Sequence, residues 1–288
     1  MAAGDLRRSR RDVLLGAVGL GLAAAGCASE QADDPARTVR SSSASGTLSA
    51  ASASALPRPV TIERVRSMAR RTEIELIVIR PEGAEPDLPV CLALHGRGEN
   101  ARMFLDLGLP DMLSSLVNSQ GGSPFAVVAV DGGDSYWVAR QPEDDPQLML
   151  TDDMPKWLGE RGLATNPFAV LGISMGGYGA LNYAANPNKP VAAAISPALF
   201  LSWSEAANRD AFANEQRWRD TDPLQNVPAY TGVPVGLWCG ESDPFVDGAR
   251  DLAEKLRPPI AEIEPGGHDA TYWRKVLPRA LRFVGQHL

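Results

Sequence analysis

The sequence has few histidines, few cysteines and no excess of basic residues, and each shortage excludes a class of protein. Three cysteines in 288 residues cannot build a disulfide framework. Only three histidines are present, and no histidine–cysteine cluster has the spacing of metal ligands, so we expect no metal and no other cofactor. Acidic residues outnumber basic ones for a net charge of −7, which leaves no basic footprint for binding nucleic acid.

The N-terminus predicts export from the cell. Basic residues between positions 7 and 11 precede an uncharged apolar stretch at 13–26, which is too short to span a bilayer comfortably and is typical of a signal peptide. Residues 9–14, SRRDVL, resemble the twin-arginine motif, which directs the export of folded proteins in bacteria. We therefore expect residues 1–27 to form an export signal.

The end of this signal predicts a lipid anchor. Residues 24–27, AAGC, resemble a lipobox, whose cysteine becomes the lipidated first residue of a lipoprotein. Lipidation of Cys27 would tie the protein to a membrane, and the alternative is a plain cleaved signal with an incidental cysteine. Residues 28–59 are rich in serine and alanine and lack apolar periodicity, which is typical of a flexible tether. We expect an exported protein of the cell envelope, membrane-anchored or otherwise secreted.

Strand-like and helix-like patterns alternate from residue 60 to 288. This alternation predicts one α/β domain with a mainly parallel sheet and helices on both faces. A helix should begin at Thr151, where acids occupy the first turn, and Pro278 should kink or divide the terminal helix. Cys91 and Cys239 lie in apolar runs and are expected to be buried free thiols. Strands are expected at 73–79, 90–94, 125–130, 168–173, 191–196, 233–239 and 261–264.

Residues 171–177, LGISMGG, are the stretch around which the domain is organised. They place a Gly-x-Ser-x-Gly pattern between an apolar run and a helix-compatible run, which is the strand–turn–helix context of a nucleophile elbow. Gly172 and Gly176 would let strand and helix approach closely. Ser174 would then stand clear of the sheet, and the Met175 N–H would point at a substrate oxyanion. The alternative is a glycine-rich turn with a helix-capping serine.

A serine nucleophile needs a base, and His268 is the best candidate. It follows the last predicted strand in a Gly-Gly-His-Asp loop, and it comes after Ser174, as the order serine, acid, histidine of α/β-hydrolases requires. His95 also lies at a strand end but better fits the shaping of an oxyanion loop. His287 lies in the C-terminal tail, with no strand end nearby. The alternative for His268 is a loop histidine that caps the terminal helix.

Asp243 is the candidate for the acid that orients this histidine. It lies just past the predicted strand at 233–239, between Ser174 and His268 in the chain. Glu241 and Asp247 are nearby alternatives. A simpler interpretation of Asp243 is a turn residue before a proline, which Ser-Asp-Pro also favours.

The second oxyanion donor should come from the loop at 95–98, HGRG, which parallels the His-Gly-Gly-Gly loops of esterases. The Arg97 N–H is the expected donor. The Arg97 side chain could reach an acidic or carbonyl group of the substrate, or it could simply be solvated. Candidates for the substrate cleft are His95, Tyr136, Trp137 and Tyr178, and the aromatic ones equally suit core packing.

Four motifs in this order resemble the putative-esterase group of α/β-hydrolases, which includes esterase D-type enzymes, feruloyl esterases and actinobacterial mycolyltransferases. The motifs are HGRG at 95–98, GISMGG at 172–177, GESD at 240–243 and PGGHD at 265–269 with Tyr272 and Trp273. The resemblance implies an acyl-enzyme on Ser174. The export signal argues against the glutathione thioester of esterase D-type enzymes, and Asp243 stands where mycolyltransferases use glutamate.

The sequence therefore supports three hypotheses. The first is an exported serine esterase that hydrolyses a small-molecule or lipid ester through Ser174, His268 and Asp243. The second keeps this site but transfers the acyl group to a sugar or another alcohol, as mycolyltransferases do. The third is a non-catalytic, hydrolase-like lipoprotein that binds lipid or cell wall, and the loss of a triad residue would favour it. No triad residue is missing.

Overall fold

The computed structural model describes residues 59–288. The predicted export signal, Cys27 and the predicted tether up to residue 58 lie outside the described residues. None of the helices in the described part combines the length and apolar character needed to cross a membrane.

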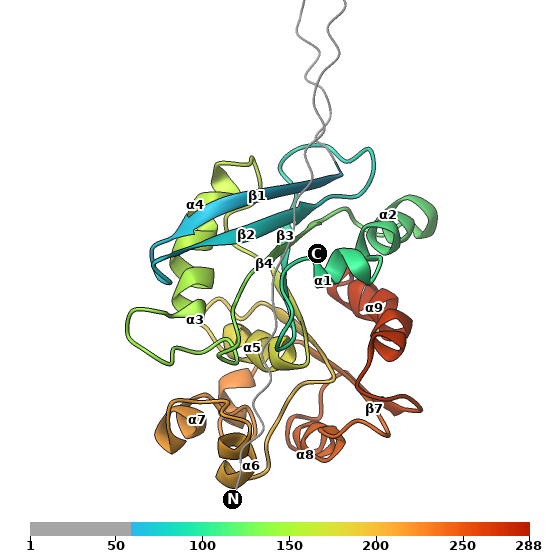
Figure 1. Cartoon of the computed structure of the whole chain (residues 1–288). Coiled ribbons are helices and arrows are strands. Elements are labelled where there is room, and N and C mark those ends of the chain that lie inside the picture. The colour runs from blue at the N-terminus through green and yellow to red at the C-terminus, as the bar shows by residue number, and fades with distance from the viewer. Residues whose placement is uncertain (1–58) are drawn as a thin grey trace, which may run out of the picture. The chain divides into compact units, whose positions relative to one another are not determined.

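The domain is built on an eight-stranded sheet with the order β1-β2-β4-β3-β5-β6-β7-β8 (Figure 1). Strands β3 to β8 are parallel to one another, while β2 is antiparallel to both β1 and β4. The predicted mainly parallel sheet is therefore confirmed. The strands are β1 (Val60–Ser67), β2 (Thr72–Ile79), β3 (Val90–Leu94), β4 (Ala126–Val130), β5 (Ala169–Ile173), β6 (Val191–Ile195), β7 (Val235–Gly240) and β8 (Ile260–Glu264).

Helices cover both faces of the sheet. Helices α1, α2 and α9 pack on one face, and α4, α5 and α8 pack on the other (Figure 1). The helical segments are α1 (Met103–Asp106), α2 (Leu109–Gln120), α3 (Pro146–Leu148), the π-helical turn η1 (Met149–Asp153), α4 (Met154–Gly159), α5 (Met175–Ala184), α6 (Trp203–Asn208), α7 (Glu215–Thr221), the 3₁₀ turn η2 (Val227–Tyr230), α8 (Val246–Leu256) and α9 (Ala270–Gly285).

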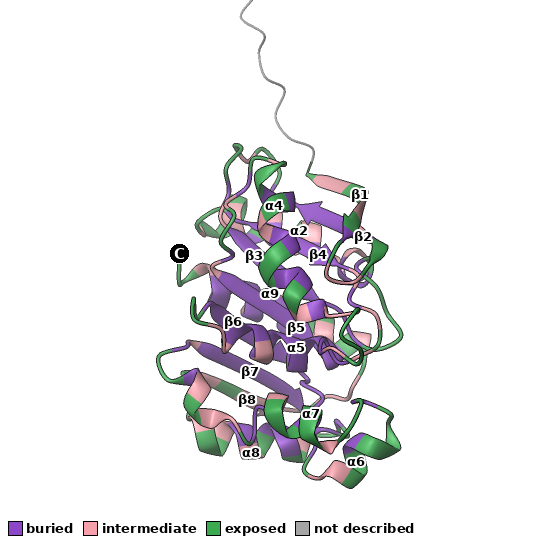
Figure 2. Cartoon of the chain, turned by 90° about the vertical axis from the view of Figure 1, so that its left-hand side faces the viewer, coloured by how far each residue is buried: buried purple, intermediate pink, exposed green. Residues whose placement is uncertain are grey.

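The double covering explains the all-apolar strands. Along β3, Val90, Leu92 and Leu94 pack into one core, while Cys91 and Ala93 pack into the core on the opposite face. Every residue of β3 is buried, and Figure 2 shows the central strands as continuous buried ribbons. Such strands lack a polar face because successive side chains point to opposite, equally covered sides.

Three local features differ from expectation. Strand β1 was not predicted, because it is an edge strand whose charged, largely exposed residues lack an apolar run. A helical segment begins at Pro146 rather than at Thr151, because the Asp145 carboxylate caps it by accepting a hydrogen bond from the Leu148 N–H. Helix α9 continues through Pro278 undivided, because the buried residues on both sides of the proline hold the helix against the sheet.

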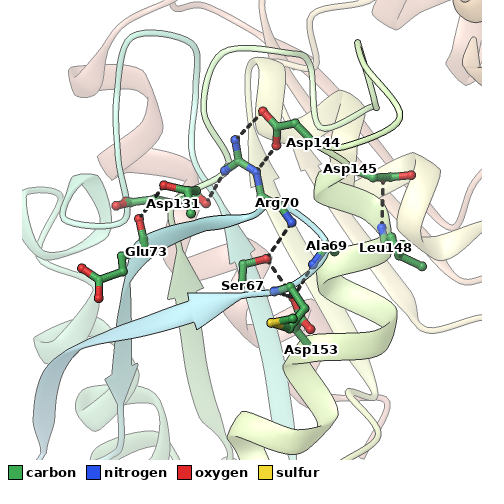
Figure 3. A network of polar contacts seen from close by, with 12 residues as sticks. Ser67, Ala69, Arg70, Glu73, Asp131, Asp144, Asp145, Leu148 and Asp153 are labelled. Carbon is green, nitrogen blue, oxygen red and sulfur yellow. Dashed lines mark hydrogen bonds and ion pairs between the residues drawn. The ribbon is translucent and has the colours of Figure 1, made fainter.

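Two charged side chains tie the β1–β2 turn to the body of the domain (Figure 3). Asp153 is 4% exposed, and its Oδ2 accepts hydrogen bonds from the Ser67 hydroxyl at 2.8 Å and from the backbone N–H of Met68 and Ala69. Arg70 forms an ion pair with Asp144 at 2.6 Å and donates to the carbonyl oxygen of Asp131 at 2.9 Å. Arg70 thereby secures the loop after β4, which leads to the candidate site.

Candidate active site

Ser174 stands in a strained turn between β5 and α5. Its φ of 57° and ψ of −119° are unfavourable for a residue with a side chain. The flanking glycines make the turn sterically feasible. A Cβ on Gly172 would lie 1.9 Å from the carbonyl oxygen of Gly176, and a Cβ on Gly176 would lie 1.8 Å from that of Leu94. The expected strand–turn–helix geometry is therefore present, and it brings α5 against the ends of β3 and β5.

Three side chains from three strand ends form a hydrogen-bonded chain. His268, after β8, places its Nε2 2.8 Å from the Oγ of Ser174, after β5. Its Nδ1 lies 2.8 Å from the Oδ2 of Asp243, after β7. The three residues are far apart in sequence, and the parallel sheet brings them to one edge because the carboxyl ends of its strands align.

The charge of Asp243 sets the direction of these hydrogen bonds. Burial alone would raise the pKa of this carboxyl, but the hydrogen bond and charge of His268 and the N–H of Phe245 outweigh burial and lower the pKa overall. An ionised carboxylate only accepts hydrogen bonds, so the Nδ1 of His268 carries the proton. The Nε2 is then left free to accept the hydroxyl proton of Ser174.

Two backbone N–H groups without a hydrogen-bond partner in the described part of the chain belong to residues close to Ser174, namely Arg97 and Met175. The loop after β3 approaches Ser174 so closely that a Cβ on Gly96 would lie 3.5 Å from the Ser174 Cβ and 4.0 Å from its Oγ. Within residues 59–288, neither the N–H of Arg97 nor that of Met175 donates a hydrogen bond. Unpaired donors beside a nucleophile are the arrangement that stabilises an oxyanion.

A sequence model of the family described as "Putative esterase" matches residues 67–284. The chain belongs to this esterase family. The predicted resemblance is thereby confirmed, and the fold is the α/β-hydrolase fold. The match spans Ser174, Asp243, His268 and the loop at 95–98. The comparison with curated proteins gives no matching relative.

Solved structures of low sequence identity share the fold of this esterase. A ferulic acid esterase superposes with a TM-score of 0.68 at 20% identity, covering 80% of this chain and 98% of its own. The S-formylglutathione hydrolase from Agrobacterium tumefaciens superposes with a TM-score of 0.65 at 18% identity, and the match covers 80% of this chain and 95% of the hydrolase. MPT51 (FbpC1) from Mycobacterium tuberculosis superposes with a TM-score of 0.65 at 16% identity, and the match covers 80% of this chain and 99% of MPT51.

His95 was predicted to contact the substrate, but it lies in the interior of the domain. Its side chain is fully buried, its Nδ1 lies 2.8 Å from the carbonyl oxygen of Gly96, and its Nε2 accepts the N–H of Gly132 at 2.8 Å. Both ring nitrogens are thus occupied by the backbone, and burial lowers the pKa of the imidazole, so the ring stays neutral. His95 holds the loop at 95–98 against the loop after β4.

The predicted cleft aromatics are core residues in this structure. Trp137 and Tyr178 have no exposed surface, and Tyr136 is 3% exposed. Trp137 donates from its Nε1 to the carbonyl oxygen of His95 at 3.1 Å, while the Tyr178 hydroxyl lies 2.9 Å from that of Thr221. Their assignment to the substrate cleft is therefore corrected, because their rings fill the core under the site.

Other residues at the site were not predicted as contacts. The His268 ring packs edge-on against Phe245 and Trp273, each with ring centres 5.3 Å apart. The guanidinium of Arg209 covers the Phe245 ring at 4.7 Å. Phe245 could have been suspected, since it lies two residues after Asp243, but Arg209 carries no local signal in the sequence.

The alternatives for the acid and the base lie elsewhere. Glu241 is exposed, and Asp247 forms an exposed ion pair with Arg250 at 3.0 Å. The Nδ1 of His287 lies 2.8 Å from the carbonyl oxygen of Phe283 at the end of the chain. The described residues contain no group of three or more potential ligands that could hold a metal ion.

Proposed function

We propose that this protein is a serine esterase that hydrolyses carboxylic esters through an acyl-enzyme on Ser174. The observation that carries the proposal is the pair of 2.8 Å hydrogen bonds joining Ser174, His268 and Asp243. Membership of the esterase family and the unpaired N–H groups of Arg97 and Met175 support it.

Acylation uses each of these groups in turn. The Oγ of Ser174 attacks the ester carbonyl carbon while the Nε2 of His268 takes its proton. Asp243 keeps the imidazole in the correct tautomer and stabilises the imidazolium. The carbonyl oxygen becomes an oxyanion that accepts the N–H groups of Met175 and Arg97. The C–O bond of the ester then breaks, and the alcohol leaves with the proton from His268.

Deacylation repeats these steps with water. His268 removes a proton from the water molecule as its oxygen attacks the acyl carbon, and the second oxyanion binds the same two N–H groups. Its collapse releases the carboxylic acid and returns the proton to the Oγ of Ser174. An acceptor alcohol in place of water would give acyl transfer by the same steps.

The first test is hydrolysis of p-nitrophenyl esters of increasing acyl length. We expect a burst of nitrophenol followed by turnover, and we expect Ser174→Ala and His268→Ala to abolish both. The matched controls are Ser204→Ala on α6 and His287→Ala in the C-terminal tail, which should keep the wild-type rate. Absence of turnover on every ester, together with failure of a fluorophosphonate to label Ser174, would contradict the proposal and favour a non-catalytic binding protein.

A parallel series with glycerol or trehalose tests the acyltransferase alternative. A hydrolase yields free acid as its main product at every acceptor concentration. An acyltransferase yields an acylated acceptor whose share of the product rises with acceptor concentration, while release of nitrophenol continues. This ratio of products distinguishes the two activities on a common site.

We also propose that the enzyme is exported and held in the cell envelope through a lipid on Cys27. The support is the sequence of residues 1–58 alone: the twin-arginine-like motif, the lipobox-like AAGC and the serine–alanine segment. We expect Cys27→Ala to move the protein from the membrane fraction to the soluble fraction. An unchanged distribution would contradict the lipid anchor.

A further inference from the structure

Two arginines lie at the edge of the candidate active site, one directly after Gly96 and the other over the ring of Phe245. Arg97 directly follows Gly96, the residue on which a Cβ would lie 3.5 Å from the Cβ of Ser174. The Nη1 of Arg97 donates a hydrogen bond to the carbonyl oxygen of Arg209, just after α6. This bond brings the segment between β6 and β7 against the oxyanion loop, and both arginines are exposed.

The side chain of Arg209 is held at the site by an aromatic ring. Its guanidinium carbon lies 4.7 Å from the centre of the Phe245 ring, a cation–π contact. The Phe245 ring in turn packs against the ring of His268, whose Nε2 contacts the Oγ of Ser174. Arg209 is therefore one aromatic ring away from the base.

Both positive charges act on a single hydroxyl group. Burial raises the pKa of Tyr136, and the charges of Arg97 and Arg209 oppose this rise. The hydrogen bond from the Nη1 of Arg97 to the carbonyl oxygen of Arg209 likewise places the two arginines on adjoining segments at this edge of the site.

Neither arginine forms an ion pair with a carboxylate within residues 59–288, although the charge of Arg97 contributes, after that of Arg140, to lowering the pKa of Asp210. The neighbouring Asp210 is already engaged by Arg140, whose Nη2 lies 2.7 Å from its Oδ1. Two guanidinium groups on adjoining segments repel each other, and an anion bound between them would relieve the repulsion. Each guanidinium also offers a planar fork of donors that matches a carboxylate or phosphate.

We propose that Arg97 and Arg209 bind an anionic group of the substrate, so that the preferred substrates are esters that carry a carboxylate or phosphate. This inference rests on the proposed esterase function. The net charge of −7 disfavours anionic substrates in general, and a positive pair at the edge of the site would offset this locally. The anionic group can belong to the acyl or to the alcohol portion of the ester.

Isosteric pairs of esters test this proposal in the purified full chain. For the alcohol side, 4-acetoxybenzoate is compared with the neutral 4-acetoxybenzamide. For the acyl side, mono-4-nitrophenyl terephthalate is compared with 4-nitrophenyl 4-carbamoylbenzoate. The para geometry prevents the carboxylate from attacking its own ester. We expect kcat/KM to be about tenfold or more higher for the carboxylate in one pair, and this preference should shrink in high salt.

Variants assign the preference to the two arginines. Arg209→Gln and Arg97→Gln should each lower the carboxylate-to-amide ratio towards one, and the double variant should remove the preference. The matched control is Arg217→Gln, an exposed arginine on α7 without an ion pair among the described residues, which should keep the wild-type ratio. A Michaelis constant that rises for the carboxylate ester alone would show that the arginines act through binding of the anion.

The possible failures are distinguishable. If the neutral esters are hydrolysed but both ratios are one or lower, the anion site is refuted and the esterase function stands. A preference that survives the double variant also refutes it. If no ester of either pair and no p-nitrophenyl acetate is hydrolysed, the proposed function itself fails, and this inference fails with it.

Discussion

Replacing Asp243 by asparagine tests the proposed mechanism because it reverses the hydrogen bonding of His268 without changing the size of the side chain. The carboxylate accepts two hydrogen bonds, from the N–H of Phe245 at 2.8 Å on Oδ1 and from the Nδ1 of His268 at 2.8 Å on Oδ2. An amide has one accepting oxygen and one donating nitrogen. The Phe245 N–H is fixed in the backbone, so the amide oxygen must face it, and the NH₂ group then faces His268.

This arrangement selects the wrong tautomer. Facing an NH₂ donor, the Nδ1 of His268 must accept, so the proton moves to Nε2, which can no longer take the proton of Ser174. The opposite amide orientation would set two donors against each other at a buried site, at a cost of about 1–3 kcal/mol, which favours the wrong tautomer by roughly ten- to a hundredfold. Loss of the charge beside the imidazolium adds to this, and we expect kcat to fall about 10,000-fold.

The assay is steady-state hydrolysis of p-nitrophenyl acetate by Asp243→Asn, with the imidazole tautomer read from ¹⁵N NMR and folding checked by thermal unfolding. The matched control is Glu241→Gln, the same change of charge at an exposed carboxylate two residues away, which should keep the wild-type kcat. A folded Asp243→Asn protein with kcat within tenfold of wild type would refute the reasoning. So would a large loss in Glu241→Gln.

Three further changes test the framework of the site. In Gly176→Ala, the new Cβ would lie 1.8 Å from the carbonyl oxygen of Leu94, so α5 and β3 must move apart. We expect the free energy of unfolding in urea to fall by about 3 kcal/mol or more. An unchanged unfolding midpoint would contradict the close packing. Burial lowers the pKa of His95 in the folded state, so the unfolded chain binds the proton first and stability falls as pH drops below about 6.5. Below that pH, the free energy of unfolding should fall less steeply in His95→Gln than in wild type, by about 1.4 kcal/mol per pH unit. Chemical denaturation between pH 7.5 and 5 measures both slopes, and equal slopes would refute this account. Burial raises the pKa of Cys91 and Cys239, so in a chain carrying Cys27→Ala we expect a thiol reagent at pH 8 to label them only after unfolding. Labelling of the native protein at the rate of a free thiol would contradict their burial.

Most strands of the sheet could be predicted from the sequence. The apolar runs at 90–94 and 191–195 could be identified as strands because a doubly covered parallel sheet leaves them no polar face. The exposed edge strand β1 could not, because three of its eight residues are charged and interrupt any apolar run. The start of the helical segment at Pro146 also escaped, because its cap is an aspartate in a polar loop.

The sequence by itself determined the types of residue at the site and their order along the chain. The glycines around Ser174 and the strand ends before Asp243 and His268 are local patterns, and a local pattern depends only on neighbouring residues. Only the tertiary structure decided which of these residues meet. It placed Asp243, and not Glu241 or Asp247, against His268. It also buried the aromatic rings that the sequence suggested for the cleft. It also brought Arg209 against Arg97 and the ring of Phe245, because contacts between distant segments depend on how the sheet and its loops pack, which no short stretch of sequence encodes.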